Sequence, residues 1–234
     1  FTLGFVLLRC DDIFDQVIHM TRLIRVDVDT LEHIVPLSQT LDRKAKIQLQ
    51  KQAVYGYRNQ LLSKQLHIVL QQDDFSKTEY GKPYLTNFPK FYFNHSHSQK
   101  HYALASSTQM HDLGVDVEDL DRKVRFEALA EHAFHANELQ HWHVLEQDRN
   151  YWFKVWTTKE AVLKAAGLGV RLNLKELETR VHPIHDGGLC HHPLIGTFAY
   201  QNFHLAQVML TVAWRSEASC HGFTFPKIQI ISAL

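Results

Sequence analysis

The sequence predicts an α+β fold with largely antiparallel sheets, on three observations. The chain has 234 residues, of which 45% are hydrophobic, so it can bury a substantial core in one large domain or two small ones. Short runs of apolar, β-branched and aromatic residues indicate strands, whereas longer stretches show helical periodicity. The two kinds of segment mix without a regular strand–helix alternation, which argues against a doubly wound parallel sheet.

These patterns give each element its expected range. Strands are expected at Leu3–Leu8, Leu66–Leu70, Phe91–Asn94, His101–Ala105, Leu113–Val117, Thr197–Gln201, His204–Trp214 and Lys227–Ile231. Helices are expected at Leu41–Lys64, Arg125–Phe134, Asn137–Leu145 and Tyr151–Ala166. This order is compatible with two roughly similar halves, residues 1–112 and 113–234, joined by a linker near Ser106–Leu113, although no residue-level repeat is evident.

Charge and cysteine content narrow the class of protein. Lys plus Arg (25) equals Asp plus Glu (25), so the chain lacks the basic excess that non-specific nucleic-acid binding requires, and we expect no nucleic-acid partner. Its three cysteines are far apart and form no CxxC motif, as is usual in a reducing cytoplasm. The apolar run Phe1–Leu8 is too short to cross a bilayer, so a cytoplasmic protein without a membrane partner is expected.

Histidine is unusually frequent, with 17 residues. None lies in an HExxH motif or in a finger-like array with cysteines. Four of them lie among Pro and Gly residues, in a stretch that is typical of an exposed loop: His182, His185, His191 and His192. A histidine-rich surface is therefore favoured over a zinc site.

An acidic strand is the first stretch that indicates chemistry. In the segment Leu113–Asp119, alternation places Asp116 and Glu118 on one face of a strand and Val115 and Val117 on the other. Gly114 allows another backbone or a ligand to approach closely. Two neighbouring carboxylates repel each other unless a cation lies between them, and hard oxygen ligands suit magnesium. The alternative is an edge strand with solvated acids.

A helix downstream carries an acid and a base on one face. The segment Trp156–Gly167 is typical of a helix, because Thr157 or Thr158 could cap its start and Gly167 could end it. Within it, Glu160 and Lys164 are four residues apart, so their side chains share one face. Glu160 is a candidate third magnesium ligand or general base, and Lys164 a candidate phosphate ligand. The alternative is an ordinary surface ion pair.

A turn and a polar strand end upstream supply basic and hydroxyl groups. Gly81 and Pro83 favour a turn that presents the Lys82 ammonium to a phosphate. Ser96 and His97 follow at the end of a strand and can donate hydrogen bonds to phosphate oxygens. A hairpin with partly exposed histidines is the alternative.

Three segments in this order resemble one family. Gly81-Lys82-Pro83 with Phe93–Ser98 resembles its first signature, Gly114–Glu118 its second and Trp156–Lys164 its third, while Phe134–Glu138 is similar to a short element between the last two. The family is the 4'-phosphopantetheinyl transferases of the long, single-chain type, which activates peptide and polyketide synthases. The resemblance implies a monomer of two pseudo-symmetric α+β halves, each with a small antiparallel or mixed sheet packed on a long helix, and an active site in the cleft between them.

The resemblance also implies the site. Magnesium, with manganese as an equally compatible ion, would be held by Asp116, Glu118 and Glu160. The substrate coenzyme A would be contacted by Arg58, Lys82, Pro83, Asn94, Ser96, His97, Asp116 and Lys164. Position 95, usually apolar in the family, is a histidine here.

The implied reaction moves 4'-phosphopantetheine from coenzyme A to a serine of an acyl or peptidyl carrier protein and releases 3',5'-ADP. Glu160 would be the general base and Lys164 a second catalytic cation, while Arg122, Lys123, Arg125 and Phe126 are candidates for carrier docking. Two other functions use the same residues: a metal-dependent phosphodiesterase acting on a nucleotide, and a carrier-binding protein of this fold without catalysis.

Overall fold

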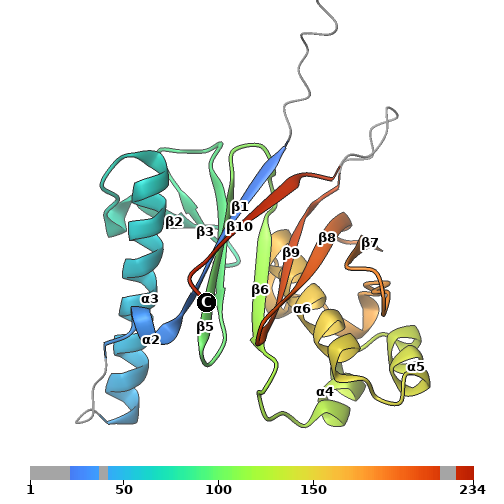
Figure 1. The fold of residues 1–234 in the computed structure, drawn as a ribbon. Helices are drawn as coiled ribbons and strands as arrows, with labels where there is room; N and C mark the ends of the chain where they lie inside the picture. The colour runs from blue at the N-terminus through green and yellow to red at the C-terminus, as the bar shows by residue number, and fades with distance from the viewer. Residues whose placement is uncertain (1–21, 37–41, 217–224) are drawn as a thin grey trace, which may run out of the picture.

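The computed structural model describes residues 22–36, 42–216 and 225–234, which form an α+β fold with two four-stranded sheets (Figure 1). The first sheet has the order β10 (Lys227–Ser232), β1 (Leu23–Thr30), β5 (His101–Ser107) and β4 (Tyr92–His97). The second has the order β6 (Gly114–Asp119), β9 (Val208–Arg215), β8 (Gly196–Leu205) and β7 (Gly187–His192). Apart from the parallel pair β1–β10, both sheets are antiparallel, which confirms the predicted α+β class with largely antiparallel sheets.

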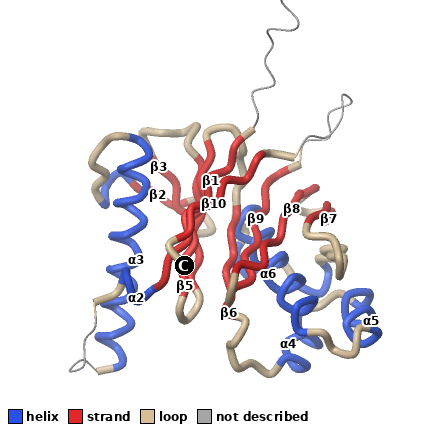
Figure 2. The backbone as a smooth tube through the Cα atoms, viewed as in Figure 1, coloured by secondary structure: helices blue, strands red, loops and turns tan. Residues whose placement is uncertain are grey.

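Helices cover the outer faces of the two sheets. The first sheet packs against α3 (Arg43–Leu66), with α2 (Leu31–Ile34) beside it. The second packs against α6 (Arg149–Ala166), and α4 (Phe126–Ala133) and α5 (Ala136–Val144) contribute to the same core. The remaining elements are the small hairpin β2–β3 (Phe75–Lys77 and Pro83–Leu85) and the 3-10 turns η1 (Gln72–Asp74), η2 (Gly169–Arg171) and η3 (Leu174–Glu176). Figures 1 and 2 show the resulting order of layers: helix, sheet, sheet, helices.

Strand alternation produces three separate cores. In β5, Ala103 and Ala105 point to the second sheet, whereas Tyr102 and Leu104 point to α3. In β6, Val115 and Val117 join the core between the sheets, as the sequence predicts, while the carboxylates alternate with them. The acidic side chains of β6 therefore face away from the central core, toward α6.

Two close approaches fix β6 against its neighbours. The side-chain oxygen Asn94 Oδ1 in β4 accepts a hydrogen bond of 2.9 Å from the backbone nitrogen of Val115, which ties the two sheets together. On the other side, a Cβ added to Gly114 would lie 2.0 Å from the carbonyl oxygen of Ala161, so only glycine admits the backbone of α6 at this distance. Of the two partners predicted for Gly114, another backbone or a ligand, the structure shows the backbone of α6.

Helix α6 begins earlier than its predicted cap. Asp148 Oδ1 accepts a 2.6 Å hydrogen bond from the backbone nitrogen of Tyr151 and caps the helix, which starts at Arg149. The prediction of a cap at Thr157 or Thr158 is wrong, because both threonines are buried in mid-helix. The predicted end is confirmed, since Gly167 has a left-handed φ of 73°.

Several other predicted boundaries are also wrong. No strand forms at Leu66–Leu70, because α3 continues to Leu66 and the left-handed His67 ends it. The range His204–Trp214 contains parts of two strands, separated by a turn at residues 206–207. Ser106 and Ser107 belong to β5 and not to a linker. The predicted strand Leu3–Leu8 lies outside the described residues.

The histidine-rich stretch is only partly a loop. His182 and His185 are exposed and their rings stack with centroids 4.4 Å apart. His191 and His192, in contrast, lie in β7, where pairing with β8 buries His192. The strand was not predicted, because the Pro and Gly residues in and around it are typical of a loop.

The strand β10 returns to the first sheet. Its Ile228 and Ile230 pair with Ile24 and Val26 of β1. Residues 227–232 therefore complete the sheet that β1, β4 and β5 form near the start of the chain. The predicted domain boundary between residues 112 and 113 stays a prediction. Among the described helices, none combines the length and the apolar character needed to cross a membrane.

Candidate functional site

A lysine, a carboxylate and a serine meet where the two sheets adjoin α6. Lys164 Nζ donates to Asp116 Oδ1 at 2.6 Å and to Ser96 Oγ at 2.7 Å, and Ser96 Oγ donates to Asp116 Oδ1 at 2.9 Å. Asp116 is only 4% exposed, and its second oxygen, Oδ2, is buried and has no hydrogen-bond partner among the described residues. Three elements far apart in the sequence thus converge on one carboxylate with acceptor capacity to spare.

Glu118 lies on the same face of β6 as Asp116, as the sequence predicts. Its Oε1 accepts a 3.0 Å hydrogen bond from Trp156 Nε1 of α6, and its Oε2 pairs with Arg122. Burial and the nearby charge of Asp116 raise the pKa of Glu118, although Arg122 opposes the shift. The carboxylate is therefore held by one neutral and one charged donor.

Glu160 completes the acidic group from α6, one helical turn before Lys164. Burial raises the pKa of Glu160, and the charges of Asp116 and Glu118 raise it further, while Lys164 opposes them. Glu160 borders a cavity of about 490 Å³ whose walls include Leu163 and Lys164. Its side chain thus faces a cavity and feels both strand carboxylates.

The three acids fit a divalent cation by their chemistry. Among the described residues, no group of three or more His, Cys, Asp or Glu side chains stands in a preformed metal-binding arrangement. Two features nevertheless suit a cation: the unpartnered oxygen Asp116 Oδ2, and the raised pKa values of Glu118 and Glu160, which a positive charge would lower. Glu118 would exchange its contact with Arg122 to bind such an ion.

A second cavity, of about 220 Å³, extends from Lys164 toward the predicted phosphate-binding turn. Its walls include the turn Tyr80–Pro83, with Asn94 and Lys164. The two cavities share Leu163, Lys164 and Gly169, so they form one groove. We name it the Lys164 groove, with a Tyr80 end and a Glu160 end.

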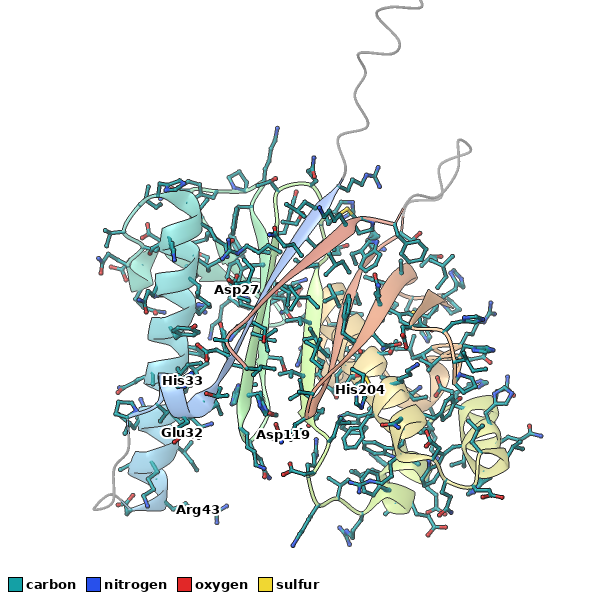
Figure 3. The ribbon with its side chains drawn as sticks, in the orientation of Figure 1. Asp27, Glu32, His33, Arg43, Asp119 and His204 are labelled. Carbon is teal, nitrogen blue, oxygen red and sulfur yellow. The ribbon has the colours of Figure 1, made fainter. Side chains whose placement is uncertain are left out.

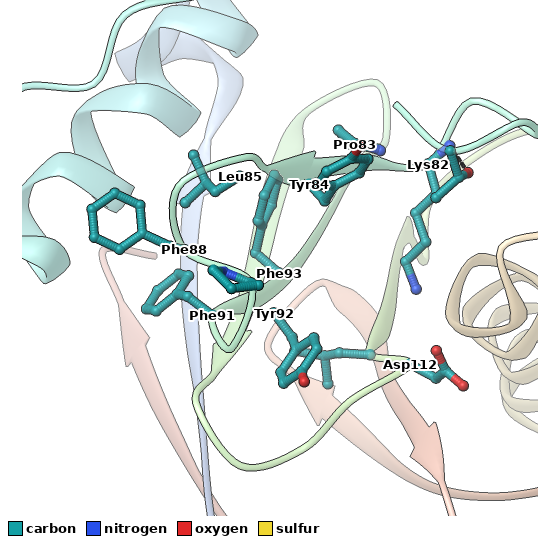
Figure 4. Close-up of a pocket in the computed structure, with 12 residues that line it drawn as sticks. Lys82, Pro83, Tyr84, Leu85, Phe88, Phe91, Tyr92, Phe93 and Asp112 are labelled. Carbon is teal, nitrogen blue, oxygen red and sulfur yellow. Dashed lines mark hydrogen bonds between the residues drawn. The ribbon is translucent and has the colours of Figure 1, made fainter. Parts of the chain in front are cut away.

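Lys82 crosses beneath the Tyr80 end with its ammonium directed at the backbone. Lys82 Nζ donates a 2.7 Å hydrogen bond to the carbonyl oxygen of Ala165 in the last turn of α6. Beyond it lies an aromatic pocket of about 260 Å³, shown in Figure 4, whose walls include Phe88, Tyr92 and Asp112. Lys82 and Pro83 thus border both the groove and the aromatic pocket.

The side chain of Lys82 should titrate near pH 8. Burial lowers its pKa from 10.5 to about 8 because it disfavours the charged amine. The unfolded chain therefore binds more protons than the folded chain between pH 8 and 10.5, so this residue adds stability as the pH rises through that window. NMR titration of the Lys82 Cε–Nζ resonances, assigned by Lys82→Arg, measures the midpoint. A midpoint near 10.5 would contradict the burial of the amine.

The two histidines of β4 have different surroundings. His97 is exposed at the strand end, and its pKa is lowered by partial burial and by Lys164. His95 packs between the rings of Tyr55 and Tyr102, and its buried Nδ1 has no hydrogen-bond partner in the described part of the chain. Burial and the charge of Arg58 lower the pKa of His95 to about 3, so this histidine is neutral and serves as a packing residue.

Arg58 is not brought to the groove. It is 3% exposed, its guanidinium lies 4.0 Å from the ring centroid of Phe75, and it donates to Asn59 Oδ1 at 2.8 Å. Of the residues proposed for carrier docking, Arg122 pairs with Glu118 and Phe126 packs on Trp152, whereas Lys123 and Arg125 are exposed.

A buried ion pair behind the groove was not predicted. Lys159 Nζ pairs with Glu138 Oε2 at 2.7 Å and also donates to the carbonyl oxygens of Leu174 and Leu177. Glu138 Oε1 accepts from Thr179 Oγ1 at 2.5 Å. Lys159 is 1% exposed and Glu138 2%. Two features of the sequence could have indicated this pair. Lys159 is adjacent to Glu160, and Glu138 ends the segment Phe134–Glu138, which is similar to an element of the family.

The first half contains a similar set of contacts between strand and helix. Asp27 and Asp29 alternate along β1, and Asp27 is visible on this strand in Figure 3. Gln65 Nε2 donates to Asp27 at 3.0 Å and the Tyr57 hydroxyl donates to Asp29 at 2.7 Å, both from α3. Protein donors thus satisfy both carboxylates.

The contacts of β1 with α3 match those of β6 with α6 in order and spacing. In each strand–helix pair, the first carboxylate of the strand accepts a hydrogen bond from the later helix residue: Asp27 from Gln65, and Asp116 from Lys164. The second carboxylate accepts from the helix residue eight positions earlier: Asp29 from Tyr57, and Glu118 from Trp156. By the same spacing, Leu61 holds the place of Glu160. Only the second pair therefore has a third acid.

Acidic and basic side chains that meet beside an open groove are typical of enzymes that act on phosphate esters. Residues 112–219 match the model of the 4'-phosphopantetheinyl transferase superfamily. Three similar proteins are the 4'-phosphopantetheinyl transferases ffp of Bacillus subtilis, HetI of Nostoc sp. and Sfp of Bacillus subtilis strain 168.

The similarity extends over about half of each chain. The ffp protein is 33% identical over 52% of this chain and 54% of its own length, and HetI is 34% identical over 55% of both chains. Sfp is 29% identical over 52% of this chain and 54% of its own length. The chain spans about half the length of the curated relatives it matches.

Proposed function

We propose that this protein transfers the 4'-phosphopantetheine group of coenzyme A to a serine of an acyl or peptidyl carrier protein. The observation that carries the proposal is the convergence of Lys164, Asp116 and Ser96 on one side of a groove that Glu160 also borders. A pyrophosphate placed along this groove would meet a fixed cation and three acids. The family segment contains Asp116, Glu160 and Lys164, which supports the same activity.

The chemistry is a displacement at phosphorus. The oxygen of the carrier serine forms a bond to the β-phosphorus of coenzyme A, the bond from that phosphorus to the bridging oxygen breaks, and 3',5'-ADP leaves with the bonding electrons. Glu160 accepts the serine proton, because it borders the groove one helical turn from Lys164. Lys164, fixed by Asp116 and Ser96, stabilises the charge that grows on the phosphate oxygens.

A divalent metal belongs to this proposal. Magnesium or manganese held by Asp116, Glu118 and Glu160 would neutralise part of the pyrophosphate charge. The unpartnered Asp116 Oδ2 supports a ligand at this position. The remaining residues of the chain act by binding and orientation: Pro83 and Asn94 border the Tyr80 end of the groove, and His97 lies at the adjoining end of β4.

Two similar halves also belong to the proposal. The matching contacts of β1 with α3 and of β6 with α6 support an internal twofold relationship, with coenzyme A bound between the halves by a single chain. The Lys164 groove is bordered by β4 of the first half and by α6 of the second, which is the position such a ligand requires.

Mass spectrometry of carrier proteins tests the function. The protein, magnesium, coenzyme A and an unmodified carrier should together yield a carrier heavier by one phosphopantetheine, with release of 3',5'-ADP. Carriers from fatty-acid, polyketide, peptide and lysine pathways should be tried in parallel. Unchanged mass in all of them would overturn the proposal, and metal-dependent hydrolysis of coenzyme A without any carrier would identify a phosphodiesterase instead.

A further inference from the structure

The segment Gly167–Leu172 forms the rim of the Lys164 groove opposite the Tyr80–Pro83 turn. Gly167 and Gly169 both have left-handed backbone angles, with φ of 73° and 61°, which turns the chain sharply after α6. Gly169 borders both cavities of the groove. The turn therefore brings Arg171, which follows the two glycines, to the edge of the groove.

Arg171 reaches across this rim to Tyr80. Its guanidinium carbon lies 4.5 Å from the centroid of the Tyr80 ring, a cation–π contact between the two sides of the groove. The Tyr80 side chain lines its end of the groove and is 39% exposed, so a ligand can reach it. The contact fixes a permanently charged group at the end of the groove that lies away from Glu160, because Glu160 borders only the other cavity.

The charge of Arg171 is not used by the protein itself. Among the described residues, no carboxylate forms an ion pair with Arg171, and its side chain is exposed. Other cations near the groove are already engaged: Lys164 binds Asp116, and Lys82 donates to the carbonyl oxygen of Ala165. Arg171 is thus an available cation for a second anionic group of the ligand.

Coenzyme A carries phosphate at two places, the pyrophosphate and the 3'-phosphate of the ribose. The proposed function assigns the pyrophosphate to Lys164 and the acids, so a cation at the Tyr80 end would meet the other phosphate. We propose that Arg171 binds the 3'-phosphate of coenzyme A, with Tyr80 positioning its guanidinium. This inference rests on the proposed function, and it assigns the 3'-phosphate to a residue of the second half.

Coenzyme A and dephospho-coenzyme A, which lacks only the 3'-phosphate, provide the test. Titration calorimetry should show that Arg171→Ala weakens the binding of coenzyme A about tenfold, as expected for the loss of one charged hydrogen-bonding partner, and leaves dephospho-coenzyme A within twofold. Arg171→Lys should fall between the two proteins. Tyr80→Ala should weaken coenzyme A selectively, whereas Tyr80→Phe keeps the ring and should bind normally.

Arg180→Ala is the matched control, because Arg180 is an exposed arginine that is paired with Glu178 and does not border the groove. It should bind both ligands like the parent protein. Equal weakening of both ligands by Arg171→Ala, or no weakening of either, would overturn the inference while transfer by the parent protein still supported the function. A parent protein that neither binds coenzyme A nor modifies any carrier would overturn both.

Discussion

Replacing Glu160 with glutamine should lower the rate of phosphopantetheine transfer about 10²- to 10⁴-fold, the usual contribution of a general base. Glutamine keeps the shape of the side chain but cannot accept the serine proton or carry the charge that a metal would meet. Because Glu160 borders a cavity and makes no ion pair with another described residue, the fold should be retained. The loss should appear in the single-turnover rate of carrier modification more than in coenzyme A binding.

Glu127→Gln is the matched control, since Glu127 is an exposed glutamate of α4, and it should leave the rate unchanged. The pH profile supplies a second readout. A carboxylate base loses its activity on acidification, because the protonated acid can no longer accept the serine proton. Glu160→Gln should therefore remove the acidic limb of the profile. A variant that kept more than half of the parent rate would rule out Glu160 as the base.

Replacing Lys159 with methionine should lower the free energy of unfolding by about 3–5 kcal/mol, because it leaves the buried carboxylate of Glu138 without its cation. The same lysine satisfies the carbonyl oxygens of Leu174 and Leu177, so the segment leading from α6 to Thr179 would also lose its attachment. Since Leu174 borders the Glu160 end of the groove, part of the activity should disappear with the stability.

Urea unfolding followed by circular dichroism measures this effect. Lys175→Met, at an exposed lysine of η3, should change the free energy by less than about 0.5 kcal/mol. The double variant Lys159→Met with Glu138→Gln should recover part of the loss, because a neutral amide is less costly to bury than an unpaired carboxylate and can still accept from Thr179. A loss below about 1 kcal/mol in Lys159→Met would show that the pair contributes little.

Local periodicity predicted the parts of the site that depend on one element. Alternation along β6 predicted the shared face of Asp116 and Glu118, and helical spacing predicted that Glu160 and Lys164 lie one turn apart. The contact of Lys164 with Ser96 joins residues 68 positions apart, so no local pattern contains it. Only the family resemblance placed these two residues near the same ligand.

The sequence could not show which charged side chains face the groove. Arg58 and Lys159 look like surface charges in a helical pattern, yet both are almost fully buried, because aromatic rings cover one and Glu138 pairs with the other. Two similar halves were expected from the order of elements and from the family resemblance, but no residue-level repeat was recognised, although Val26–Asp29 and Val115–Glu118 read alike. The matching helix contacts come from Gln65 and Lys164, two chemically different residues that no sequence pattern relates.

The pairing of β10 with β1 has a consequence during synthesis. Roughly two hundred residues separate the two strands, so β1 leaves the ribosome long before its parallel partner is translated. Until then one edge of β1 presents unpaired backbone groups to other nascent chains, which is the exposure that favours aggregation. A chaperone that shields this edge during translation should raise the yield of native protein.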